Sequence, residues 1–252
     1  MTVSLVRPLL PANPIGRRLL NSLIEYWPLD EASGNRRGLH NGLTLTDTNT
    51  VTGNPGPSSK LPTASECLRA NSETLVRAGD DVLLSMGDIA CTFSIWVYVN
   101  AKFAGDWQVF LGKNKAFNDD REYVLWLDDT DRFALNVGND ATNTAGGNVA
   151  DTALGSPALS TWYLLFGWHD PIANTISIQV NNLASASASY SNGVYDGGIG
   201  FAIGKQNGAT TFYTSSRLAG AAIWKRLLTA QERAWLFNNG VGRSFAEGRG
   251  FY

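Results

Sequence analysis

The stretch FSIWVYV, residues 93–99, decides the fold class. Bulky side chains occupy both alternating faces of this run, with Phe93, Ile95, Val97 and Val99 on one face and Ser94, Trp96 and Tyr98 on the other. A strand with one wet face would alternate between apolar and polar residues. We therefore expect a central strand whose second face is either covered or forms an aromatic platform.

Runs of strand length recur through the rest of the chain, at residues 74–77, 107–112, 122–128, 132–138, 161–169, 175–181, 200–205 and 212–224. Many short strands with almost no helix indicate a sandwich or a barrel. One helix is expected near the C-terminus. Thr229 and Glu232 have the spacing of a capping box, Ala230 to Asn239 follows as the helix, and Gly240 is suited to end it.

The composition excludes several classes of protein. The chain has 252 residues, with 20 Lys and Arg against 22 Asp and Glu. This near-neutral balance gives no electrostatic reason to expect nucleic acid or an anionic membrane as a partner. No apolar run approaches the length that crosses a bilayer. The two cysteines, Cys67 and Cys91, are too few for a disulfide scaffold, and we interpret them as core residues rather than a bridge.

Residues 1–20 differ from the rest of the chain. They carry three prolines and three arginines but no acid: Arg7, Pro8, Pro11, Pro14, Arg17 and Arg18. Because proline removes a backbone donor and fixes φ, we expect an extended arm that docks on a partner, with a frayed terminus as the alternative. The segment does not have the pattern of a signal peptide, which favours assembly in the cytoplasm or export with a larger particle.

Five stretches carry a family resemblance, in this order: LIEYWPLDEASG (23–34), RANSETLV (69–76), MGDIACTFSIWVYVN (86–100), WYLLFGWHDPIANTISIQVNN (162–182) and RLAGAAIWKRLLTAQERAWLFNNG (217–240). Together they resemble the laminin-G-like, concanavalin A-like jelly-roll domains of the phage and metagenomic type. The resemblance implies an all-β sandwich of two antiparallel sheets with one short C-terminal helix. It places the sandwich at residues 21–242 and leaves 243–252 as a tail.

The resemblance also bears on calcium. In this family an acidic pair in the closing strand often helps to hold a structural calcium, and Ala219 and Gly220 stand at those positions here. We therefore predict no cofactor. A calcium site built from loop oxygens stays open as an alternative, with Asp128, Asp129 and Asp131 as weak candidates. Aspartate in such a turn also caps its own backbone, and we favour that interpretation.

The patterns expected of a catalytic site are missing. Sandwich glucanases of this fold place their acids as E-x-D-x-x-E on one strand face, and the sequence has no such motif. His40 and His169, the only histidines, have no cysteine or histidine at metal-ligand spacing and no nucleophile motif near them. We predict that the chain is not an enzyme, with a glycoside hydrolase as a distant alternative.

Binding is the function that remains. Trp96, Tyr98 and Trp126 fall on the parity opposite the most aliphatic positions, and we name them as candidates for contact with a glycan or a partner protein. We predict a structural module on a virion surface, as a capsid decoration or tail-associated protein assembled in the host cytoplasm. It would dock through its arm onto other structural proteins and form a homo-oligomer. An extracellular, lectin-like carbohydrate-binding domain is the alternative.

Overall fold

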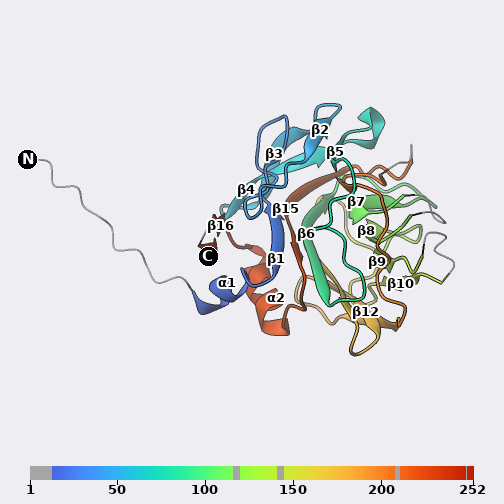
Figure 1. The fold of residues 1–252 in the computed structure, drawn as a ribbon. Helices are drawn as coiled ribbons and strands as arrows, with labels where there is room; N and C mark the ends of the chain where they lie inside the picture. The colour runs from blue at the N-terminus through green and yellow to red at the C-terminus, as the bar shows by residue number, and fades with distance from the viewer. Residues whose placement is uncertain (1–12, 116–119, 141–144, 208–210, 248) are drawn as a thin grey trace, which may run out of the picture.

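The computed structural model describes residues 13–115, 120–140, 145–207, 211–247 and 249–252, and it confirms the predicted two-sheet antiparallel jelly-roll sandwich (Figure 1). One sheet has eight strands. Seven of them form the path β13 (Ala186–Ser189), β12 (Thr175–Val180), β11 (Trp162–Asp170), β6 (Cys91–Val99), β15 (Ser216–Trp224), β4 (Leu61–Cys67) and β3 (Thr52–Ser58), and β1 (Leu23–Trp27) pairs with β15. We call it the eight-stranded sheet.

The second sheet, which we call the seven-stranded sheet, packs against the first. Its strand order is β10 (Gly147–Ala150), β9 (Phe133–Val137), β8 (Tyr123–Leu127), β7 (Gln108–Lys113), β14 (Phe201–Ile203), β5 (Thr74–Arg77) and β2 (Thr46–Thr48). A small hairpin, β16 (Phe245–Ala246) with β17 (Gly250–Phe251), and two helices, α1 (Pro14–Arg18) and α2 (Ala230–Phe237), complete the fold. No helix of the described residues is long and apolar enough to cross a membrane.

The core lies between the two sheets. Strand β6 sits between β11 and β15, as its sequence predicts, and turns Phe93, Ile95 and Val97 into this core. The ring of Phe93 stacks on Tyr123 of β8, with the ring centroids 4.2 Å apart. Burial of each such side chain contributes about 1.5–3 kcal/mol to folding.

Cys67 and Cys91 are both buried in this core, and both are free thiols. Burial raises the pKa of Cys91 to about 12. The pKa of Cys67 is raised further, again chiefly by burial. Neither thiol therefore forms the reactive thiolate at neutral pH.

The outer face of the eight-stranded sheet is covered by the two helices and the C-terminal hairpin (Figure 1). Phe245 and Phe251 of the hairpin contact Tyr26 of β1, with ring centroids 4.7 and 5.1 Å from the tyrosine ring. Residues 243–252, expected as a tail outside the sandwich, thus include part of its covering layer.

Helix α1 differs from the extended arm expected for residues 1–20. Asn13 caps the helix by accepting a hydrogen bond from the backbone N–H of Ile15, at 2.9 Å. Pro14 occupies the first turn, where a missing N–H costs nothing, so proline there is compatible with a helix. Trp224 donates its indole N–H to the carbonyl of Leu19 at 2.7 Å, which ties the segment to the domain's own sheet. Arg7, Pro8 and Pro11 lie outside the described residues.

Helix α2 begins as predicted and ends early. The Thr229 hydroxyl accepts from the Glu232 N–H while the Glu232 carboxylate accepts from the Thr229 N–H, which completes the capping box. The helix ends at Phe237 because Asn238 and Asn239 both adopt left-handed backbone conformations, with φ of 48° and 53°. Asparagine tolerates this conformation better than most residues, so the helix ends before it reaches Gly240.

Candidate ligand-binding face

Trp96, the first predicted binding residue, is covered. It lies on the outer face of β6 and is only 3% exposed. Phe237 of α2 stacks over it, with the ring centroids 6.0 Å apart. Trp96 therefore packs between the sheet and its covering helix, and a ligand could reach the indole only if α2 moved.

Tyr98 lies two residues further along the same face and is half-buried. Trp162 of β11 packs beside it at 5.4 Å, and the guanidinium of Arg217 lies over its ring at 5.0 Å. Arg217 in turn pairs with the Glu66 carboxylate at 3.2 Å. We call Tyr98, Trp162, Arg217 and Glu66 the Tyr98 patch.

Trp126, the third predicted residue, lies on β8 of the other sheet. It faces outward there, in a small cluster with Val109, Val124 and Ala134, and is 3% exposed. The three aromatic residues therefore do not form one platform, because they lie on opposite outer faces of the sandwich. Strand parity predicts whether a side chain faces the core, but it carries no information about which sheet a strand joins.

The acidic stretch 128–131 forms a turn. The Oδ1 atom of Asp128 accepts from the backbone N–H groups of Thr130 and Arg132, both at 2.9 Å, and from the Thr130 hydroxyl at 2.7 Å. Asp129 is exposed, and Asp131 has a left-handed φ of 60°. Within the described ranges, no three His, Cys, Asp or Glu side chains gather where they could hold a metal ion.

The outer face of the seven-stranded sheet brings together a set of residues that the sequence analysis did not connect. Aromatic rings lie around Trp126 on this face, and amide side chains lie on β9 and in the segments that follow β7 and β14. We call the set the outer patch: Trp107, Asn114, Arg121, Trp126, Asn136, Gln206 and Phe212.

The aromatic end is built around Trp126. Half-buried Trp107, which precedes β7, lies 6.2 Å from the Trp126 ring. Phe212 contacts Trp107 edge to face at 5.5 Å and is also half-buried. The guanidinium of Arg121 lies over Trp126 at 5.1 Å. Rings of this kind offer flat apolar surfaces with a polar neighbour.

The polar end lies two residue pairs further along β8 and β9. Asn136 of β9 pairs with Val124 of β8 and accepts a hydrogen bond from Arg121 at 2.8 Å. Burial lowers the pKa of Arg121 to about 10, so its guanidinium stays charged at neutral pH. This charged group joins the amide end of the patch to the aromatic end.

Asn114 and Gln206 supply the remaining amides and are both fully buried. Asn114 lies over Gly112, where a Cβ would come within 2.8 Å of its Oδ1 atom. Both polar atoms of the Asn114 side chain, and Oε1 of Gln206, have no hydrogen-bond partner among the described residues. A buried polar atom left unpaired costs about 1–3 kcal/mol, so this is a place where a bound polar group would contribute most.

These residues suit recognition rather than bond cleavage. The outer patch has amide, guanidinium and aromatic groups, and none of its members is a carboxylate. Strand parity singles out Trp126 alone among these residues. Asn114 and Gln206 follow strands in loop sequence, where no periodicity marks a side chain as buried.

The chain belongs to the concanavalin A-like lectin/glucanases superfamily, whose family model matches residues 71–232, well over half of the chain. That description spans lectins and glucanases, so membership is compatible with binding and with catalysis. No match was found among curated proteins.

Solved structures share the fold at low identity. Domain 4 of AbnA, an extracellular arabinanase from Geobacillus stearothermophilus solved with arabinotriose, has a TM-score of 0.60 at 14% identity, over 84% of this chain and 97% of that one. The binding domain of Paraclostridial Mosquitocidal Protein 1 has a TM-score of 0.68 at 14% identity, over 88% of this chain. Trypanosoma rangeli sialidase has a TM-score of 0.59 at 14% identity, over 86% of this chain. The chain spans 53% of the mosquitocidal binding domain and 33% of the sialidase.

Proposed function

We propose that this chain is a non-catalytic carbohydrate-binding module and that the outer patch holds the glycan. The observation that carries the proposal is the juxtaposition of buried, unpartnered amide atoms on Asn114 and Gln206 with half-buried rings at Trp107 and Phe212. Sugars present hydroxyl groups around their edge and apolar C–H groups on their faces. Amides can pair with the first, and aromatic rings can stack on the second.

The comparisons support this proposal without testing it. Domain 4 of the arabinanase matches over nearly its whole length, and its structure was solved with an oligosaccharide. At 14% identity that likeness extends to the fold alone, so the place and the identity of a glycan on this chain rest on the outer patch.

The proposal is tested by a glycan array followed by calorimetry with the best oligosaccharide. We expect Trp107→Ala to weaken binding by roughly 10-fold to 100-fold, since loss of an aromatic stacking partner costs about 1–3 kcal/mol. Trp162→Ala is the matched control, because it removes a half-buried tryptophan from the opposite outer face. Loss of binding in Trp162→Ala alone would transfer the site to the Tyr98 patch, and an array with no binding would contradict the proposal.

The module is proposed to be non-catalytic because glycoside hydrolysis needs a placed pair of carboxyl groups, commonly about 5–10 Å apart. The outer patch supplies none from its own residues. We expect the oligosaccharide that binds to be recovered intact after prolonged incubation, as measured by the release of reducing ends. If reducing ends are still released after further purification of the protein, and that release is lost in Trp107→Ala, the chain is a hydrolase instead.

Attachment to a larger assembly is a second candidate function, and helix α1 offers an observation that favours it. Gly16 and Leu19 turn toward the domain, whereas Pro14, Arg17 and Arg18 are exposed. A basic, exposed surface next to the N-terminal segment suits an acidic surface on another structural protein. We propose that such docking places the module, as a homo-oligomer, on a virion surface.

This second proposal has its own experiment. The Arg17→Ala/Arg18→Ala double variant should keep its glycan affinity but lose incorporation into particles when it is co-expressed with the neighbouring structural genes. Light scattering on the isolated protein reports the oligomer. Normal incorporation of the double variant and of a chain lacking residues 1–12 would contradict docking through this segment.

A further inference from the structure

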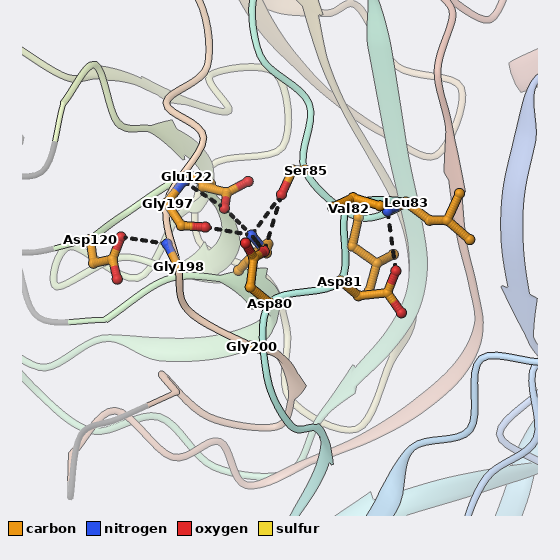
Figure 2. A network of polar contacts seen from close by, with 12 residues as sticks. Asp80, Asp81, Val82, Leu83, Ser85, Asp120, Glu122, Gly197, Gly198 and Gly200 are labelled. Atoms are coloured by element: carbon orange, nitrogen blue, oxygen red, sulfur yellow. Dashed lines mark hydrogen bonds and ion pairs between the residues drawn. The ribbon is translucent and has the colours of Figure 1, made fainter.

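Lys113 at the end of β7 is a fully buried lysine that contacts oxygen atoms on every side. Its Nζ donates to Asp80 Oδ1 at 2.7 Å, to Ser85 Oγ at 2.8 Å and to the Gly197 carbonyl at 2.8 Å, and it also contacts Glu122 Oε1 (Figure 2). We call Asp80, Ser85, Glu122 and Gly197 the oxygen cage.

The cage joins parts of the chain that are far apart in sequence. Asp80 and Ser85 come from the loop between β5 and β6, Glu122 immediately precedes β8, and Gly197 comes from the loop before β14. Figure 2 shows Asp80, Ser85, Glu122 and Gly197 gathered close together, with dashed lines running between them. The ammonium therefore holds two loops against the end of β7 and the start of β8, which are neighbouring interior strands of the seven-stranded sheet.

The arrangement has the chemistry of a hard-cation site. An ammonium group has three hydrogens, yet four oxygen atoms surround it. Those four are two carboxylates, a hydroxyl and a backbone carbonyl, which are the ligand types that Ca²⁺ takes.

The second carboxylate oxygen of Glu122 is an independent pointer to a ligand. The side chain is 0% exposed, and Oε2 has no hydrogen-bond partner among the described residues. Oε1, by contrast, accepts from the Gly197 N–H at 3.0 Å as well as contacting Lys113. A carboxylate with one oxygen already in the cage and a second one free can bind a metal ion through both.

We propose that the oxygen cage is a calcium-type site that this chain fills with its own ammonium group, and that shortening Lys113 opens the cage to Ca²⁺. Once Glu122 has released its proton, the two carboxylates of the cage carry two negative charges against one positive charge on the lysine. Removal of the lysine leaves both carboxylates uncompensated, and a divalent cation restores the balance. The native protein, with the cage filled, keeps its loops in place without an external metal.

The test uses the full chain with Lys113→Ala, measured by thermal unfolding in chelator-treated buffer. For Ca²⁺ at a hundredfold excess over its dissociation constant, we expect Tm of the variant to rise by about 5 °C or more. Tm of the wild-type protein should move by less than about 1 °C with Ca²⁺ or with chelator. Lys205→Ala, which removes a half-buried lysine outside the cage, is the matched control and should also be insensitive.

Further variants separate a built site from general charge effects. Lys113→Ala/Glu122→Gln should lose the response to Ca²⁺. Mg²⁺ should replace Ca²⁺ poorly, since it demands a more regular shell of ligands. An equal response to Mg²⁺, or one that survives Glu122→Gln, would overturn the proposal.

The proposal can still be tested if Lys113→Ala does not fold without metal. If Lys113→Ala is unfolded in chelator and regains its near-ultraviolet circular dichroism on addition of Ca²⁺, the proposal is supported. Lys113→Ser, which leaves a smaller void and adds an oxygen, is the second variant. If neither variant responds to Ca²⁺, folded or unfolded, the cage does not accept the ion and the proposal is wrong.

Discussion

Glu25 shows how a single side chain can fix a long loop. It is fully buried on β1, and its two carboxylate oxygens accept four backbone N–H groups. Oε1 accepts from Tyr26 at 2.9 Å and His40 at 2.6 Å, and Oε2 accepts from Asn41 at 3.1 Å and Leu43 at 2.7 Å. Satisfying four donors offsets the cost of burying the carboxylate.

Glu25→Ala should therefore be among the more damaging single substitutions. It strands up to four backbone donors, each costing about 1–3 kcal/mol when unpaired, and partial entry of water leaves an expected loss of about 3–5 kcal/mol. Urea unfolding measures this loss. Glu247→Ala is the control, since it removes a carboxylate from an exposed ion pair with Arg37 and should change stability by less than about 1 kcal/mol. Similar losses in the two variants would contradict this role for Glu25.

Glu122 makes the stability of the folded protein depend on pH, and the direction of that dependence follows from the pKa of its carboxyl. Burial raises its pKa to about 8, despite the opposing pull of Lys113, and the nearby Asp196 adds to the rise. The folded carboxyl thus keeps its proton between about pH 4.5 and 8, where the unfolded chain releases it. Stability from this group is fully present below the lower value and is lost as pH rises through the upper one.

We expect Glu122→Gln to flatten the stability profile across this window. The wild-type protein should lose at most about 1.4 kcal/mol per pH unit through this single proton, because folded and unfolded states differ by one bound proton there. Urea unfolding at pH 5, 6, 7 and 8 measures both slopes. A wild-type profile that rises from pH 5 to 8, or an identical slope in the variant, would assign the pH dependence to other groups.

At the scale of elements, α1 depends on a close approach of two backbones. A Cβ placed on Gly16 would lie 2.1 Å from the Phe251 carbonyl oxygen, so the helix sits on the C-terminal hairpin only with glycine there. Gly16→Ala should displace α1, destabilise the protein by about 1–3 kcal/mol and speed proteolysis at the hairpin. Arg17→Ala, an exposed change in the same helix, should do neither. Unaltered proteolysis in Gly16→Ala would show that the helix adjusts without leaving the hairpin.

The two helices also show which elements the sequence could predict. The capping box at Thr229 is a local signal with a specific hydrogen-bond geometry, and it located the start of α2. Helix α1 has only five residues, and what stabilises it is packing on Phe251, which comes from the far end of the chain. No local pattern carries that contact, so the prolines lead to the prediction of an extended arm instead of a helix.

At the scale of the whole molecule, the fold follows from patterns that are local to each strand, and the site does not. The runs around Phe93 and Leu165 indicate central strands, and the family resemblance then supplies their order. The candidate site depends on which sheet each strand joins. That assignment separates Trp96 from Trp126. It also aligns Gly112, over which Asn114 lies, with Asn136 through their shared neighbour Val124, a long-range pairing that no single run encodes.

The two outer faces of the sandwich differ in how far other elements cover them. One face is largely covered by α1, α2 and the C-terminal hairpin, and half-buried aromatic rings such as Tyr98 and Trp162 of the Tyr98 patch lie among and beside these covering elements. Hydroxyl-radical footprinting compares these rings directly. With glycan bound, we expect oxidation of Trp107 and Phe212 to fall severalfold while Tyr98 and Trp162 stay unchanged. Protection of Tyr98 and Trp162 alone would place the ligand on the eight-stranded sheet, and equal protection of both pairs would indicate general stabilisation rather than contact.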